Sequence, residues 1–158
     1  MLDLPGMQPP DFGAHIVALA LAYLLALPLG WNREKEERSA GLRTFPLVAV
    51  ATCGFIEATE ALATGHPEAM ARIIEGLITG MGFIGGGAIL RRADSVHGTA
   101  TAASLWVTGA VGAAVGLGSL DVAVLLSATT FLTLSVMRPI KRLAGAEGDE
   151  RETDDQVS

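Results

Sequence analysis

The sequence lacks most of the residues and motifs from which an enzyme or a disulfide-bonded protein could be built. Its one cysteine, Cys53, stands inside an apolar run, which excludes a disulfide framework or a thiolate metal site within one chain. It has no G-x-S-x-G nucleophile motif, no Walker A loop and no H-E-x-x-H zinc motif. We therefore expect no enzymatic activity, and we interpret Cys53 as a small core residue.

Positive charge and aromatic side chains are scarce as well. The chain has 11 Lys and Arg residues against 17 Asp and Glu, and aromatics make up only 5% of it. No basic stripe interleaved with aromatics is present, so we expect no nucleic-acid partner. Residues 145–158 hold much of the excess acid and are predicted to form a disordered tail. Residues 1–13 carry no Lys or Arg before the first apolar run, which argues against a cleaved signal peptide.

What the sequence does have is long apolar runs. Half of its residues are hydrophobic and the mean hydropathy is +0.44. The first run, residues 14–30, would span roughly 26 Å as a helix, enough for a slightly thinned bilayer core. We predict an all-α membrane protein, a bundle of five transmembrane helices within a domain of residues 14–144. The predicted spans are 14–30, 45–63, 73–90, 100–117 and 120–137.

The distribution of basic residues predicts the orientation of these five spans. All 11 Lys and Arg residues except Arg72 fall on one side of the membrane when five crossings are counted. Because basic loops stay in the cytoplasm, the N-terminus, with residues 1–13, is predicted outside. The 31–44 loop, the 91–99 loop and the C-terminus are then cytoplasmic.

Glycine is abundant, with 19 residues, and its spacing predicts close helix packing. Residues 80–85 match the G-x-G-x-x-G dinucleotide pattern, but they lie within an apolar run and not between a strand and a helix. Gly-x-x-x-Gly pairs at 76/80, 82/86 and 112/116 instead favour close approach of helix backbones. The sequence has more of these pairs than one five-helix bundle needs for its own packing, and this surplus predicts homo-oligomers. The run 85–87 leaves open a broken or re-entrant helix there.

Polar residues in three of the spans recur at the spacing of one helical face, and we expect these stripes to point inward, because lipid cannot satisfy polar groups. The stripes are Cys53, Glu57, Glu60 and Thr64; Glu75, Thr79, Gly82 and Gly86; and Thr101, Ser104, Thr108 and Gly112.

Four carboxylates near the outer half of the bundle form a candidate cation or proton site: Glu57, Glu60, Glu75 and Asp121. Oxygen ligands of this kind suit Mg²⁺. The alternative is structural: Glu57 is protonated and bonded to a hydroxyl of another helix, while the other three carboxylates reach the headgroups. His15, His66 and His97 do not cluster in the sequence and are interpreted as interfacial.

Several segments, taken together over roughly residues 20–120, resemble the N-terminal membrane domain of the MgtC/SapB family. The segments are 38–48, Arg72 with Ile73, 80–89 and 98–106. The motif positions carried over are Gly41, Leu42, Arg43, Thr44, Arg72, Gly80, Gly82, Phe83, Gly85, Gly87, Gly98, Thr101, Ala102, Ala103 and Trp106. With Arg33 and Arg38, these positions are treated as shared scaffold and candidate partner surface.

The resemblance implies a multi-pass protein of the bacterial inner membrane, linked to low-magnesium adaptation and in some pathogens to survival in host cells. It implies a regulator, with the F-type ATP synthase or a magnesium-transporting P-type ATPase as candidate partners. Apart from the candidate Mg²⁺ at the four carboxylates, we expect no cofactor. The alternatives are a small oligomeric carrier or channel for protons or divalent cations, and a structural membrane subunit.

The chain also departs from the family pattern. Asn32 stands where the family usually has Glu in Gly-x-Glu-Arg, and Thr99-Ala100-Thr101 replaces a pattern with one more polar side chain. The cytoplasmic domain that longer relatives append is expected to be missing.

Overall fold

The computed structural model describes residues 12–35, 40–63, 66–92 and 95–155. This described part of the chain forms five helices and one short hairpin. The helices are α1 (Phe12–Glu34), α2 (Thr44–Ala63), α3 (Pro67–Gly87), α4 (Thr99–Gly116) and α5 (Leu120–Asp155). Strands β1 (Leu90–Arg92) and β2 (Ser95–His97) pair antiparallel between α3 and α4, with Leu90 opposite His97.

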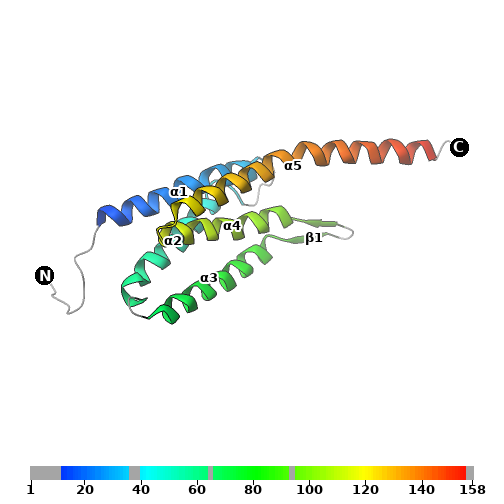
Figure 1. Cartoon of the computed structure of the whole chain (residues 1–158). Helices are drawn as coiled ribbons and strands as arrows, with labels where there is room; N and C mark the ends of the chain where they lie inside the picture. Colours follow the sequence, from blue (N-terminus) through cyan, green and yellow to red (C-terminus); the bar gives the residue numbers. More distant parts are fainter. Residues whose placement is uncertain (1–11, 36–39, 64–65, 93–94, 156–158) are drawn as a thin grey trace.

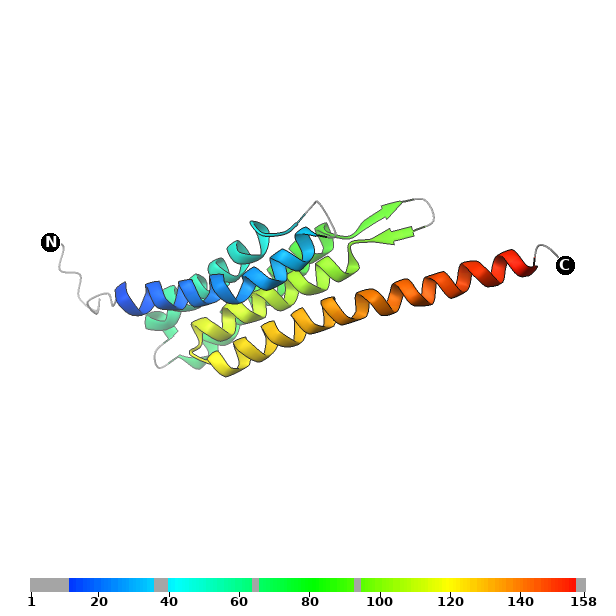
Figure 2. The same cartoon turned by 90° about the horizontal axis from the view of Figure 1, so that it is seen from above.

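Successive helices run in opposite directions along the bundle (Figures 1 and 2). The hairpin and the C-terminal part of α5 lie at one end, while the N-terminus of α1 and the turn between α4 and α5 lie at the other. Three described helices are long and apolar enough to cross a membrane: α1, α4 and the Leu120–Met137 part of α5. The all-helical class is therefore confirmed, and five crossings with their orientation remain a prediction.

Helix α4 is the centre of the bundle and contacts all four other helices. Its glycines allow this. A Cβ on Gly112 would collide with the backbone carbonyl of Ala49, and a Cβ on Gly116 would lie 3.0 Å from the carbonyl oxygen of Cys53. The 112/116 pair thus permits close backbone packing, as predicted, but its partner is α2 of the same chain. Because this pair already packs within the chain, it does not support the predicted homo-oligomer.

Polar residues of α4 follow the predicted inward stripe. Thr101 and Thr108 are 0% exposed and Ser104 is 2% exposed. The hydroxyl groups of Ser104 and Thr108 donate to backbone carbonyls one turn earlier, at Ala100 and Ser104. Each hydroxyl is thus satisfied within its own helix and can be buried among apolar side chains.

Helix α3 lies at the periphery, and here the predicted stripe is wrong. Glu75, Thr79, Gly82 and Gly86 are all exposed. A Cβ added to Gly76, Gly80, Gly82 or Gly86 would meet nothing within 4 Å, so neither predicted glycine pair on α3 packs on a helix of this chain. The reason is that α3 approaches α4 through only part of its surface, at Met81 and Gly85, which are buried.

The start of α3 and the end of α5 differ most from those expected. Helix α3 begins at Pro67 and not at 73, because proline in the first turn and Glu68 beside it favour a helix start. It continues unbroken to Gly87, so the triple glycine does not interrupt it before its end. Helix α5 reaches Asp155, so residues 145–155 are helical where a disordered tail was predicted. Three of these residues are Glu, a strong helix former.

Candidate functional site

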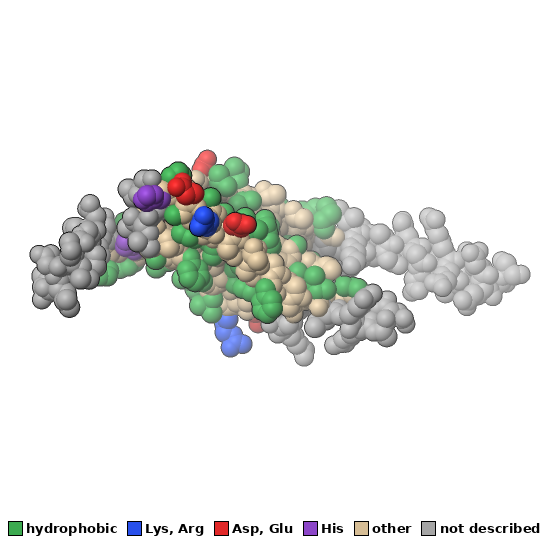
Figure 3. Space-filling model, turned by 90° about the horizontal axis from the view of Figure 1, so that it is seen from below, with side chains coloured by type: hydrophobic (Ala, Val, Ile, Leu, Met, Phe, Trp, Pro, Cys, Tyr) green, Lys and Arg blue, Asp and Glu red, His purple; other side chains and the backbone are tan. Residues whose placement is uncertain are grey.

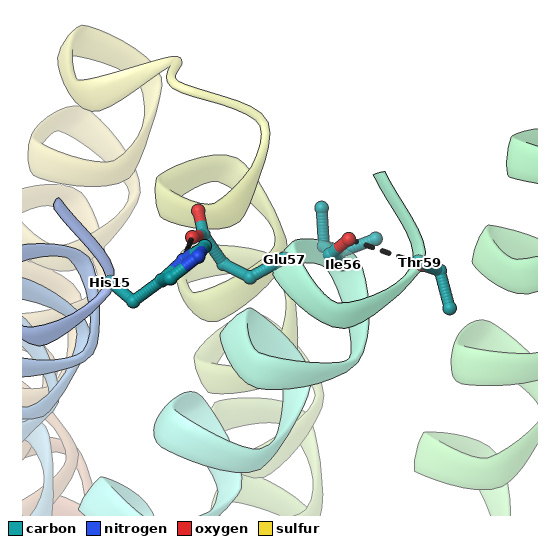
Figure 4. Close-up of polar contacts among 4 residues, drawn as sticks. All are labelled: His15, Ile56, Glu57 and Thr59. Atoms are coloured by element: carbon teal, nitrogen blue, oxygen red, sulfur yellow. Dashed lines mark hydrogen bonds and ion pairs between the residues drawn. The ribbon is translucent and has the colours of Figure 1, made fainter. Parts of the chain in front are cut away.

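An imidazole and a carboxylate join α1 and α2 at the end of the bundle opposite the hairpin. The imidazole Nδ1 of His15 contacts the carboxylate Oε2 of Glu57 (Figure 4). The Glu57 side chain is 18% exposed and that of His15 is 44% exposed. The hydroxyl expected as a partner for Glu57 is therefore replaced by an imidazole, and His15 is more than an interfacial residue.

Glu57 and Glu60 line the same cavity, which has a volume of about 590 Å³. Its walls are otherwise mostly apolar and come from the N-terminal half of α1, the turn between α4 and α5, and Met70 of α3. Glu75 and Asp121 are exposed and do not line it. The four carboxylates expected together are thus divided, with two at the cavity and two outside it.

The cavity brings together two of the four carboxylates expected to form a cation site. Among the described residues, no group of three or more His, Cys, Asp or Glu side chains could hold a metal ion. Mg²⁺ usually keeps several waters and binds through one or two carboxylates, and the Glu57 carboxylate is in contact with the imidazole of His15. A carboxylate paired with an imidazole is better suited to exchanging a proton.

Part of the motif set is buried and has a structural role. Gly98 precedes α4 with φ of +86°, a conformation that favours glycine, and a Cβ there would collide with the carbonyl of Ala88. Gly85 lies where a Cβ would come 3.4 Å from the carbonyl oxygen of Ala102. Thr101 and Ala102 are buried too. These positions hold the α3, hairpin and α4 connection together.

The connection between α1 and α2 is equally close. The backbone carbonyl of Gly41 accepts a hydrogen bond from the amide of Phe45 at 3.1 Å. A Cβ on Gly30 would lie 3.1 Å from that same carbonyl oxygen. The Glu34 carboxylate accepts the amide hydrogen of Leu42 at 3.0 Å. Glu34 therefore stabilises the connection, a role that sequence reasoning missed.

Arg33 and Asn32 are also internal. Arg33 is 2% exposed, so in this chain it does not lie on a contact surface as proposed from the sequence. Asn32 is 7% exposed and its amide donates to the hydroxyl oxygen of Ser135 on α5 at 3.2 Å. The residue that replaces the acid of the family pattern thus links α1 to α5. Arg38 lies outside the described residues.

The other motif positions are at least partly accessible. Trp106 is 45% exposed and Phe83 is 87% exposed, the largest value among the exposed large hydrophobic residues described. Ala103 also faces outward. The remaining accessible positions are Leu42, Arg43, Thr44, Arg72, Gly80, Gly82 and Gly87. The motif therefore divides into a buried part that holds the fold and an accessible part, half of it on α3, that is free to make contacts.

Comparison with known proteins agrees with the resemblance seen in the sequence. A model of the MgtC family matches residues 19–143. Protein SrpB of Synechococcus elongatus is 36% identical over 138 residues, which cover 80% of this chain and 76% of SrpB. Protein MgtC of Salmonella typhimurium is 34% identical over 142 residues, covering 87% of this chain and 60% of that protein. Protein MgtC of Brucella abortus is 35% identical over 128 residues, 80% of this chain and 53% of that protein. This chain thus spans little more than half the length of these MgtC proteins. No solved structure matches it.

Proposed function

Because this chain belongs to the MgtC family, we propose that it is a non-enzymatic regulator in the bacterial inner membrane, acting in magnesium homeostasis by binding another membrane protein. The link to magnesium rests on the family and on the resemblance, and not on a cluster of metal ligands among the described residues. The partners that the resemblance implies are the F-type ATP synthase and magnesium-transporting P-type ATPases.

The proposal includes five crossings with the N-terminus outside. Its support is the alternating direction of the five helices (Figure 1), three of which are apolar enough to span, and the one-sided distribution of basic residues. Reporter fusions test this arrangement. A reporter at His66 should lie on the outer side of the inner membrane, and one at the C-terminus should lie in the cytoplasm. Finding both reporters on the same side would refute this arrangement.

The observation that carries the regulator proposal is the unpacked outer face of α3, defined by Gly82, Phe83 and Gly86. A Cβ on either glycine would meet nothing within 4 Å, and Phe83 between them is 87% exposed. On α4, by contrast, Gly112 and Gly116 already pack against α2 of the same chain. Small residues flanking a protruding ring allow another helix to approach closely and pack around the ring.

Photo-crosslinking tests this contact. A photoreactive amino acid at Phe83, introduced in cells grown at low magnesium, should form an adduct with a different membrane protein. Leu125 on α5 is the matched control, since it is also apolar and 65% exposed, and it should give no such adduct. Identical products from both positions would argue against a specific face. Adducts with identical copies alone would favour the homo-oligomer and the structural-subunit reading.

A second candidate function, a small oligomeric carrier of protons, is favoured by the His15 and Glu57 pair at an open cavity. Purified protein in liposomes should then dissipate a pH gradient, and Glu57→Gln should stop it. No proton flux in the wild-type protein would leave the regulator as the remaining function.

A further inference from the structure

An apolar groove runs between α2 and α3 and has a volume of about 700 Å³. Its α2 wall includes residues one turn apart, Leu47, Ala51 and Phe55, and its α3 wall matches them with Gly76, Gly80 and Ile84. The two α3 glycines leave it wide, since a Cβ on either would meet nothing within 4 Å.

The inside of this groove offers little to a polar ligand. The hydroxyl of Thr52, which lines it, already donates to the carbonyl oxygen of Val48 at 2.9 Å. Seen from the side on which α3 lies, the described surface is made mostly of hydrophobic side chains, backbone and uncharged polar side chains, with few charged ones (Figure 3). In a bilayer such a groove is filled most favourably by hydrocarbon.

The groove has one charged group, and it is at one end. Arg43, just before α2, is exposed and lines the groove beside Thr44. None of the described residues lining the groove is acidic. An arginine fork matches the geometry of a phosphate group, and basic residues at the membrane surface attract anionic lipids. The groove is thus apolar along its length and positively charged at its mouth.

We propose that this groove binds an anionic phospholipid of the surrounding bilayer, with an acyl chain between α2 and α3 and the phosphate at Arg43. A second copy is a less suitable occupant. In a two-fold dimer with its axis along the membrane normal, both Arg43 side chains would lie at the same depth, so like charges would face each other. The inference rests on the membrane placement proposed above and is independent of the regulatory role.

Native mass spectrometry of the full chain in detergent tests the site, with phosphatidylglycerol and phosphatidylcholine of identical acyl chains as probes. The wild-type protein should bind phosphatidylglycerol more tightly. Arg43→Gln should weaken phosphatidylglycerol binding about fivefold, the effect of one basic residue at a membrane surface, and leave phosphatidylcholine unchanged. Gly80→Leu should weaken both lipids by filling the groove. Arg72→Gln is the control, because Arg72 is an exposed arginine on α3 that does not line the groove.

Three results would overturn the site: equal affinity of the wild-type protein for both lipids, unchanged phosphatidylglycerol binding in Arg43→Gln, or an equal loss in Arg72→Gln. A lipid-free dimer that Gly80→Leu dissociates would assign the groove to a second copy and overturn it as well. Protein that fails to enter lipid nanodiscs would refute the membrane placement together with the site, whereas the other results leave that placement standing.

Discussion

His15 and Glu57 are 42 positions apart in the sequence, yet the imidazole of one meets the carboxylate of the other across the α1 and α2 interface. A double-mutant cycle should detect this contact. His15→Gln and Glu57→Gln together should destabilise less than the sum of the two single changes, with a coupling of about 0.5–1 kcal/mol. We expect a small coupling energy because the His15 side chain is 44% exposed. Unfolding in a detergent titration measures it.

The matching cycle uses His15→Gln with Glu75→Gln, since Glu75 lies on α3 and away from the cavity. Those two changes should add within about 0.3 kcal/mol. If the changes are additive in both cycles, His15 and Glu57 do not stabilise the protein by interacting with each other.

Gly112→Ala should destabilise the bundle by about 1–3 kcal/mol, because the added methyl group meets the rigid backbone carbonyl of Ala49. Gly80→Ala makes the same chemical change on α3, where a Cβ meets nothing within 4 Å, and should be neutral or slightly stabilising. Unfolding midpoints of the detergent-solubilised protein distinguish the two. Equal losses would show that the glycines of α3 are packed after all.

Gly98→Ala should cost more stability than Gly118→Ala, although both glycines have positive φ, of +86° and +74°. A left-handed backbone costs a non-glycine residue about 1–2 kcal/mol. Gly98 adds a collision with the carbonyl of Ala88, while a Cβ on Gly118 has open space. Thermal unfolding of the two variants measures the difference, and a larger loss at Gly118 would speak against the described hairpin connection.

Ser135→Ala should destabilise the chain by about 1 kcal/mol, because it removes the acceptor for the buried amide of Asn32. Thr133→Ala is the control on the same helix, since Thr133 is exposed and its hydroxyl donates only to the carbonyl of Thr129. That change should stay within about 0.5 kcal/mol. Chemical unfolding of both variants provides the measurement, and similar values would mean that the link between α1 and α5 contributes nothing.

The helices could be predicted because uninterrupted apolar runs and turn residues mark them. The ends of α1, α2, α4 and the start of α5 lie within a few residues of those expected. The start of α3 was missed because Glu68 and Arg72 shorten the apolar run, although Pro67 and Glu68 are themselves start signals. The hairpin was missed because strands of three residues leave almost no periodic pattern.

The site was harder to predict than the fold, because it depends on which helix packs at the periphery. A stripe of polar and small residues on Thr101, Ser104 and Thr108 is buried, whereas the same spacing on α3 faces outward. Periodicity identifies a face but not its neighbour. The pairing of His15 with Glu57 likewise depends on how α1 and α2 align, which no local pattern encodes.

Gly82 and Gly86 make no close packing contact that the bundle requires, since a Cβ on either would meet nothing within 4 Å. Substitutions there would leave the architecture intact and alter only what docks from outside. Relatives built on the same helices could therefore diverge in what they recognise without first having to re-evolve how they fold.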